Sequence, residues 1–223
     1  ALDTYRRVLG EEHRDTVVAI ISMGSLLEAQ GKLAEAEPFY REAIEKNRRV
    51  LGEDHEDTAT AINNMGTLLR ARGKPAEALP YCSEALEKTR RLLGDEHPST
   101  LIRISNMGAV LQSLGRLDEA EPFYREALEK SRRLLGEEHP NTLMVTNNLG
   151  TFLQAAGKFA EAEPYMRDAL NKGRRTLGEN HPGTLTLTNN VGAVLKAQGK
   201  LDEAAPYCRE ALDKRRLVLG EDH

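Results

Sequence analysis

The six histidines of the chain stand at a constant spacing of 42 residues. They are His13, His55, His97, His139, His181 and His223. Sixteen of the 18 glycines keep the same period, and only Gly173 and Gly183 fall outside it. A fixed period of this length is typical of a repeat array, in which each unit packs mainly against its neighbours. The fold must therefore be read from one repeat and not from a single closed core.

The period divides the chain into one partial unit and five full units. Residues 1–13 (ALDTYRRVLGEEH) align with the second half of the next repeat, AIEKNRRVLGEDH. The full units are residues 14–55, 56–97, 98–139, 140–181 and 182–223. No linker or change of composition interrupts the series. We therefore expect a single repeat domain over residues 1–223, excised from a longer array.

Each unit has the pattern of two helices, as the fourth unit shows. Pro140 suits the first helical turn, where its missing N–H is not needed. Leu149 and Leu153 lie four residues apart, on one apolar stripe. Gly157 is typical of the left-handed residue that follows a helix, and a second apolar stripe begins after a short turn. Short turns make the paired helices antiparallel, so the sequence predicts an all-α protein of ten helices after a stub over Ala1–Leu9.

Composition restricts the surroundings and the partners. The net charge of −4 argues against a nucleic-acid surface, which needs a clustered excess of basic residues. No apolar run approaches the roughly 18 residues of a membrane span, and no signal peptide opens the chain. Cys82 and Cys208 stand at the same position of two distant repeats, too far apart for a disulfide. We expect a cytoplasmic protein, with both cysteines free and buried.

The repeat unit resembles the tetratricopeptide repeat. Its first helix carries I-x2-M-G-x2-L from Ile62 to Leu69, in the place of W-x2-L-G-x2-Y. Its second helix carries Ala120-x3-Tyr124, in the place of A-x3-F. Two departures are that isoleucine or threonine replaces the tryptophan, and that the period is 42 instead of 34 residues.

The longer unit, with LGxEHPxTL, NNLG and EAEPxxREAL, is similar to the 42-residue repeats of kinesin light chains. Similar arrays are attached to STAND-type NTPase receptors. The resemblance implies an α-solenoid, a right-handed superhelix of stacked antiparallel helix pairs. It also implies that the first helix of each pair lines a concave groove, with the second helices outside.

No set of residues in the chain has the spacing of a catalytic or metal site. A zinc site needs about four converging ligands, whereas the repeat spreads the histidines singly along the array. Gly24 to Lys32 fails as a phosphate loop, because its glycines are too far apart and Leu33 follows the lysine. The repeated Arg-Arg pairs lie beside acidic pairs and are read as a solvated face. We expect no enzymatic activity, no metal and no cofactor.

A polar stripe along the first helix of each repeat is the candidate binding site. The predicted contacts with a ligand are Asn63, Asn64, Thr67, Arg70, Ser105, Asn106, Gln112, Asn147, Asn148, Thr151, Gln154, Asn189, Asn190 and Lys196. Asparagine offers two N–H donors and an acceptor, so it can hold the backbone of an extended peptide without demanding a particular side chain. The family resemblance implies the same role, since related repeats bind extended cargo segments through asparagines of the groove.

A structural interpretation competes with this one. The second asparagine of each pair precedes a core position and can equally well bond a neighbouring repeat; these residues are Asn64, Asn106, Asn148 and Asn190. The first asparagine is more favourably placed for a ligand, and Asn147 and Asn189 are expected to point away from the stacking interface. Only Arg70 and Lys196 of the stripe are basic, which argues against a clamp for a C-terminal carboxylate.

The leading functional hypothesis is a protein-interaction module of the adaptor or scaffold type that binds an extended peptide of a partner protein. Two alternatives stay open: a sensory or regulatory array within a larger NTPase or signalling protein, and an architectural spacer. The helices at the two ends lack the polar caps that repeat arrays normally carry, so head-to-tail self-stacking is also expected.

Overall fold

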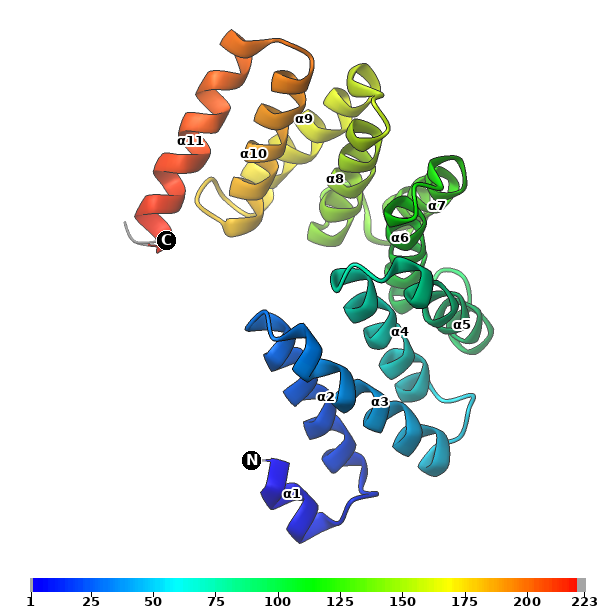
Figure 1. Cartoon of the computed structure of the whole chain (residues 1–223). Coiled ribbons are helices and arrows are strands. Elements are labelled where there is room, and N and C mark those ends of the chain that lie inside the picture. Colours follow the sequence, from blue (N-terminus) through cyan, green and yellow to red (C-terminus); the bar gives the residue numbers. More distant parts are fainter. Residues whose placement is uncertain (1, 220–223) are drawn as a thin grey trace. The chain divides into compact units, whose positions relative to one another are not determined.

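The computed structural model describes residues 2–219, and all of its regular structure there is helical (Figure 1). The helices are α1 (Leu2–Leu9), α2 (Arg14–Ala29), α3 (Leu33–Val50), α4 (Glu56–Ala71), α5 (Pro75–Leu93), α6 (Pro98–Ser113), α7 (Leu117–Leu135), α8 (Pro140–Ala155), α9 (Phe159–Thr176), α10 (Pro182–Ala197) and α11 (Leu201–Leu219). The predicted stub and ten helices are thus confirmed over the described residues. We call α2, α4, α6, α8 and α10 the A helices, and α3, α5, α7, α9 and α11 the B helices.

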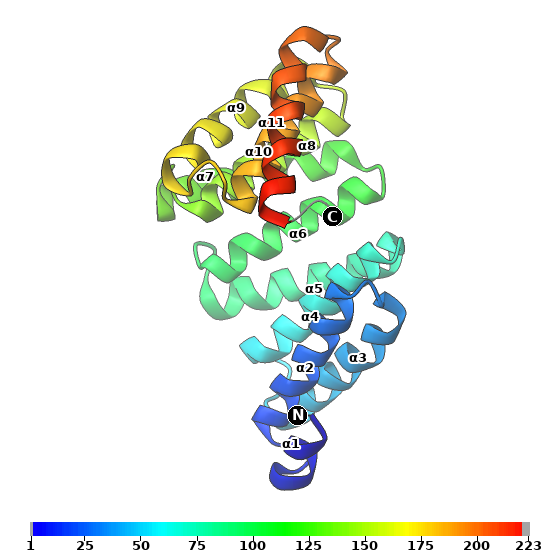
Figure 2. The same cartoon turned by 90° about the vertical axis from the view of Figure 1, so that its left-hand side faces the viewer.

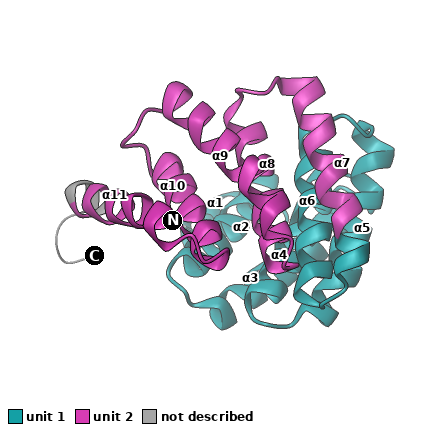
Figure 3. Cartoon of the chain, turned by 90° about the horizontal axis from the view of Figure 1, so that it is seen from above, with its two compact units in different colours: residues 1–120 teal, residues 121–223 magenta. Residues whose placement is uncertain are grey.

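The chain forms two compact units, Ala1–Ala120 and Glu121–His223, coloured separately in Figure 3. In the first unit, α4 packs against α5 of its own repeat and against α3 of the repeat before. In the second unit, α10 packs in the same way against α11 and α9, and Figure 2 shows α10 beside α11. Each A helix named here therefore lies between two B helices, which is the stacking of a solenoid. One continuous domain over the whole chain stays a prediction.

The histidine that marks the period is the N-cap of each A helix. The Nδ1 atom of His139 accepts a hydrogen bond from the backbone N–H of Asn141 at 3.2 Å. The bond recurs at His13, His55, His97 and His181. It satisfies one of the backbone donors that the first turn of a helix leaves unpaired. The histidines from His13 to His181 are thus structural, and His223 lies outside the described residues.

The glycine after each A helix ends it as predicted. Gly157 has a φ of 75°, in the left-handed region that residues with a Cβ rarely adopt. The next backbone N–H, of Lys158, donates to the carbonyl of Leu153 at 2.9 Å. This closing turn pairs carbonyls of the last turn and reverses the chain into the B helix.

The core of each helix pair is centred on the glycine inside the A helix. A Cβ added at Gly150 would lie 2.7 Å from Cγ of Met166, and one at Gly66 would lie 2.5 Å from Sγ of Cys82. The residue in the place of the family's phenylalanine thus packs directly on the backbone of the A helix. Large side chains such as Phe152 are fully buried beside it. The glycine is therefore required for close packing of the pair.

The two cysteines differ in burial, which corrects one expectation. Cys82 is buried, and this burial raises the pKa of its thiol to about 11. Cys208 is exposed, because no described A helix follows α11 to cover it. Neither forms a disulfide. Within residues 2–219, no helix is both long and apolar enough to cross a bilayer.

Candidate functional site

The A helices α8 and α10 of the second unit enclose a cavity of about 550 Å³. Its lining is mostly apolar and consists of Pro140, Asn141, Leu143, Met144, Asn147, Leu177, His181, Gly183, Thr186 and Leu187. Gly183 stands where the other repeats carry aspartate, serine or asparagine. A Cβ there would approach His181 and Leu177, so the missing side chain leaves this part of the cavity open. The cavity lies beside one of the predicted contacts, Asn147.

The apolar residues of this cavity are partly in solvent. Leu143 and Leu187 are buried, but the side chain of Met144 is 57% exposed. Ile102 and Val18, at the same position in other repeats, are 54% and 51% exposed. The same position is threonine in the two remaining repeats, Thr60 and Thr186. An exposed apolar side chain near the N-terminal end of the A helix is therefore a feature of three of the five repeats.

The asparagines of successive A helices bond to each other. In the second unit, Nδ2 of Asn190 donates to Oδ1 of Asn147 at 2.9 Å. In the first unit, Nδ2 of Asn106 donates to Oδ1 of Asn63 at 2.8 Å. Both bonds run from the second asparagine of one repeat to the first asparagine of the repeat before it. The asparagine pairs therefore link neighbouring A helices within each unit.

These bonds correct the expected position of Asn147. Its carbonyl oxygen lies at the stacking interface and does not point away from it. Its amide group, however, makes no hydrogen bond to any described residue, and neither does that of Asn63. Asn63 is only 8% exposed, whereas Asn147 is half-buried and Asn189, at the same position of the next repeat, is exposed. Of these three residues, Asn189 is thus the most exposed and Asn63 the least.

The remaining residues of the stripe are divided between helix contacts and solvent. The hydroxyls of Thr67 and Thr151 donate to backbone carbonyls three residues before them, of Asn64 and Asn148. The side chain of Asn64 has no hydrogen-bond partner among the described residues, because Ile21 occupies the matching position of the repeat before. Half-buried residues of the stripe are Ser105, Gln112, Asn148 and Gln154, and exposed ones are Arg70 and Lys196.

Arg103 is a buried charge that sequence reasoning did not single out. Its side chain donates to the hydroxyl of Thr60 at 2.8 Å and to the carbonyl of Ser99 at 2.9 Å. It is 5% exposed, and this burial lowers the pKa of its guanidinium. The matching residues of other repeats, such as Ala61, are apolar. The signal available in the sequence was a charged residue at a position that is apolar in the other repeats. In the structure, the hydrogen bond from Arg103 to Thr60 links α6 to α4.

The residues of the site hold no recognisable metal or catalytic set. Among residues 2–219, no three His, Cys, Asp or Glu side chains gather closely enough to hold a metal ion. The arrangement consists of amide donors, hydroxyls and apolar side chains. Such groups bind by hydrogen bonding and burial.

Comparison with known proteins agrees with this architecture. The tetratricopeptide repeat sequence profile matches residues 18–81, 57–106, 101–171 and 142–216. No curated protein sequence matches the chain.

Three solved structures have similar folds. The nearly identical TPR-like repeats described as a kinesin light chain of Podosopora anserina superpose with a TM-score of 0.75 at 19% identity, over 92% of this chain and 98% of that one. BtubC from P. vanneervenii superposes with a TM-score of 0.78 at 22% identity, over 98% and 88%. The Rap conjugation gene regulator of plasmid pLS20, in complex with the Phr* peptide, gives 0.71 at 18%, over 87% of this chain and 52% of that one. These likenesses show the fold, a solenoid of helix pairs.

Proposed function

Because the chain belongs to the tetratricopeptide repeat family, we propose that it is an interaction module that binds an extended peptide of a partner protein along its A helices. Its role would be that of an adaptor or scaffold. The family membership supports a protein-binding role in place of an enzymatic one. The Rap regulator supports a peptide as the ligand, since that protein of similar fold is in complex with one.

One observation carries the proposal: a free amide donor stands beside an open apolar cavity. The N–H groups of Asn147 have no described partner, and Asn147 itself lines the cavity between α8 and α10. An extended peptide alternates its side chains, so a backbone carbonyl and an apolar side chain can be bound at neighbouring points. The carbonyl would accept from Asn147, while the side chain would pack on Met144, Leu143 and Leu187.

The other residues of the stripe extend this binding surface in both units. Asn189 and Asn148 would offer further amide groups to the peptide backbone in the second unit. Thr151, Gln154 and Lys196 would contact its side chains. In the first unit the corresponding surface is formed by Asn63, Asn64, Thr67, Arg70, Ser105, Asn106 and Gln112.

We propose a cytoplasmic location for this module. Its two cysteines are free, which suits a reducing compartment. The net charge of −4 favours a protein over a nucleic acid as the partner.

The test separates the ligand role of Asn147 from its structural role. Asn147→Asp keeps an oxygen for the N–H of Asn190 but removes the amide donors. We expect peptides selected from a display library to bind this variant about tenfold more weakly, because a lost hydrogen bond of ~1.4 kcal/mol corresponds to that factor. Met144→Ser should also weaken binding, because it removes apolar contact from the cavity.

Asn171→Asp is the matched control, since it makes the same chemical change at an exposed position of α9. Affinities are measured by fluorescence anisotropy, with thermal unfolding recorded for each variant. The proposal fails if the selected peptides bind Asn147→Asp and Met144→Ser as tightly as they bind Asn171→Asp.

A further inference from the structure

Successive B helices are joined by a recurring ion pair. An arginine in the last turns of α1 or of a B helix bonds a glutamate 36 residues further along the chain, on the next B helix. The pairs are Arg6–Glu42 at 2.9 Å, Arg48–Glu84 at 2.9 Å and Arg174–Glu210 at 2.7 Å. The terminal nitrogens of these arginines thus have a carboxylate supplied by the next repeat.

The pair is missing between α7 and α9. Asp168 stands where the other repeats carry glutamate, and its side chain is one methylene shorter. Its carboxylate accepts from Nζ of Lys172 at 2.8 Å. Arg132 consequently makes no close ion pair with any described residue, although its charge contributes to lowering the pKa of Glu137. Its Nε is buried without a hydrogen-bond partner, as are those of the paired Arg6 and Arg174. The difference therefore lies in the terminal nitrogens of Arg132, which lack the carboxylate that the next repeat supplies elsewhere.

A second contact is missing at the same interface. Between α9 and α11, Arg167 donates to the hydroxyl of Tyr207 at 2.8 Å and its guanidinium lies 5.6 Å from the ring centroid. The matching Arg125 is bound to Glu121 and Glu161, as Arg167 is to Glu163 and Glu203, but it makes no contact with Tyr165 that corresponds to the one between Arg167 and Tyr207. The hydroxyl of Tyr165 therefore makes no hydrogen bond to a described residue.

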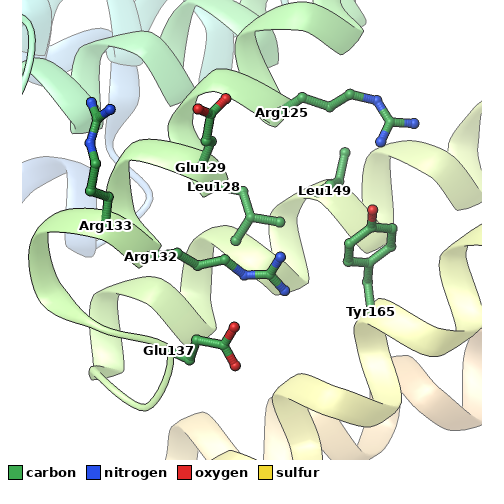
Figure 4. A pocket seen from close by; sticks show the side chains of 8 residues that line it. All are labelled: Arg125, Leu128, Glu129, Arg132, Arg133, Glu137, Leu149 and Tyr165. Atoms are coloured by element: carbon green, nitrogen blue, oxygen red, sulfur yellow. The ribbon is translucent and has the colours of Figure 1, made fainter.

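A cavity of about 460 Å³ lies at this interface (Figure 4). Leu128 and Leu149 line it, and both are buried. Figure 4 shows the guanidinium of Arg132 directed into the space between Leu128, Tyr165 and Glu137. The side chains of Arg133 and Glu129 point away from that guanidinium. The cavity thus combines a guanidinium without a close ion-pair partner, a hydroxyl without a described partner and apolar walls.

We propose that this cavity binds an acidic side chain of a partner protein, whose carboxylate pairs with Arg132. The carboxylate takes the place that glutamate occupies beside the equivalent arginines Arg48 and Arg174. Arginine holds a carboxylate through parallel N–H bonds, and the hydroxyl of Tyr165 supplies a further donor. Leu128 and Leu149 favour a partner segment with an apolar residue next to the acidic one.

Glu137 is the acidic group that faces the ligand, and its charge is balanced. Its carboxylate accepts from Nζ of Lys172 at 2.7 Å, and this hydrogen bond lowers the pKa of Glu137. Lys172 thus contacts both neighbouring acids, Glu137 and Asp168, and Arg132 supplies the second positive charge near Glu137. Most of the site lies on α7 and α9, with Leu149 of α8 as part of its wall, and its ligand is distinct from the peptide proposed for the A helices.

The probe is the tripeptide Ac-Leu-Glu-Leu-NH2, titrated into the 223-residue chain while the side-chain N–H signal of Arg132 is followed by NMR. We expect this signal to shift on binding. The tripeptide with glutamine in place of glutamate should bind about tenfold more weakly, a loss of ~1.4 kcal/mol. Equal binding of the two tripeptides overturns the proposal. Binding of inorganic phosphate at Arg132 in preference to the glutamate tripeptide overturns it as well.

Asp168→Glu is the decisive variant, because it restores the carboxylate that the other repeats have and leaves Arg132 in place. We expect it to fold normally and to bind the glutamate tripeptide about tenfold more weakly. Arg132→Gln should lose binding to the same extent. Arg174→Gln, at the arginine already paired with Glu210, should bind as the unaltered chain does. Unchanged binding to Asp168→Glu would show that the vacant position is not the binding site.

Discussion

The A-helix side and the B-helix side of the second unit join their repeats by different chemistry. On the A side, α8 and α10 are linked by a neutral amide bond between Asn147 and Asn190. On the B side, α9 and α11 are linked by charges, such as Arg174 with Glu210. Most charges of the B side have a partner within the protein, and Arg132 is one of the departures among the described residues. On the A side, the N–H donors of Asn147 have no partner among the described residues.

The energies of these contacts explain how the two sides can serve different purposes. An exposed ion pair contributes about 0–1 kcal/mol, and a hydrogen bond about 0.5–1.5 kcal/mol. Neither side therefore carries much of the stability, which comes from the apolar side chains between the helices. Single polar residues on the surface of an A helix can therefore change without loss of the fold.

The largest expected effect tests whether both sides rest on that common core. Leu153→Ala should lower the free energy of unfolding by about 2–5 kcal/mol, because Leu153 is fully buried and the change leaves a cavity. Urea unfolding followed by circular dichroism measures the loss. Leu201→Ala is the control, since Leu201 is 62% exposed. This replacement should lower the free energy of unfolding by only a few tenths of the loss expected for Leu153→Ala. Similar losses of unfolding free energy for both variants would contradict the view that the stability comes from the buried apolar core.

The next effect tests the direction of the amide bond on the A side. Asn190→Asp removes the donor and places two oxygens against each other, so we expect a loss of about 1–3 kcal/mol. Asn147→Asp keeps its acceptor oxygen and should cost less than about 0.5 kcal/mol. Thermal unfolding of the two variants side by side measures the difference. Equal losses of stability in the two variants would contradict the assignment of Asn190 as the donor and Asn147 as the acceptor.

The repeat period was sufficient to predict the fold, because each unit repeats the same local signals. Pro140 and Gly157 mark the beginning and end of a helix by their own backbone geometry, independently of distant residues. The number, length and order of the helices followed from such local chemistry. The sequence predicted the histidines as structural polar residues at the entry to the first helix of each repeat, but it did not identify His139 as an N-cap, because histidine is not among the residues usually preferred there.

The details of the site could be predicted only in part, because they depend on contacts between repeats. The sequence placed Asn147 on the stripe but could not show which of its atoms faces Asn190. The exposure of Cys208 depends on the helices around α11, which its own repeat does not reveal. The free guanidinium of Arg132 depends on one methylene of Asp168, a difference that looks conservative until the two helices are side by side. Whether the stripe binds a ligand stays a prediction.

A smaller effect is expected from pH, which changes the stability contributed by a carboxylate of the B side. Glu163 of α9 accepts hydrogen bonds from Lys200 and Arg167, and these lower its pKa from 4.5 to about 2. Since the folded pKa is the lower one, the stabilisation is present above pH 4.5 and is lost as the pH falls towards about 2. Glu163→Gln should flatten this part of the stability profile, whereas Glu45→Gln, at an exposed position, should not. A profile unchanged by Glu163→Gln would contradict the assignment.

The smallest effect comes from salt and separates the ionic side from the amide side. Arg175 and Glu138 form an exposed ion pair, so Arg175→Gln should cost about 0.2–1 kcal/mol at low ionic strength. In roughly 1 M salt the Debye length falls to about 3 Å, and this cost should nearly vanish. The cost of Asn190→Ala should persist, because a bond between two neutral amides is not screened. Chemical unfolding by urea at both salt concentrations measures the two costs without adding ions. If salt reduces the stability losses of both variants equally, the chemical distinction between the two sides is wrong. If salt reduces only the loss caused by Arg175→Gln, the ion pairs of the B side can be weakened while the contacts between the A helices stay intact.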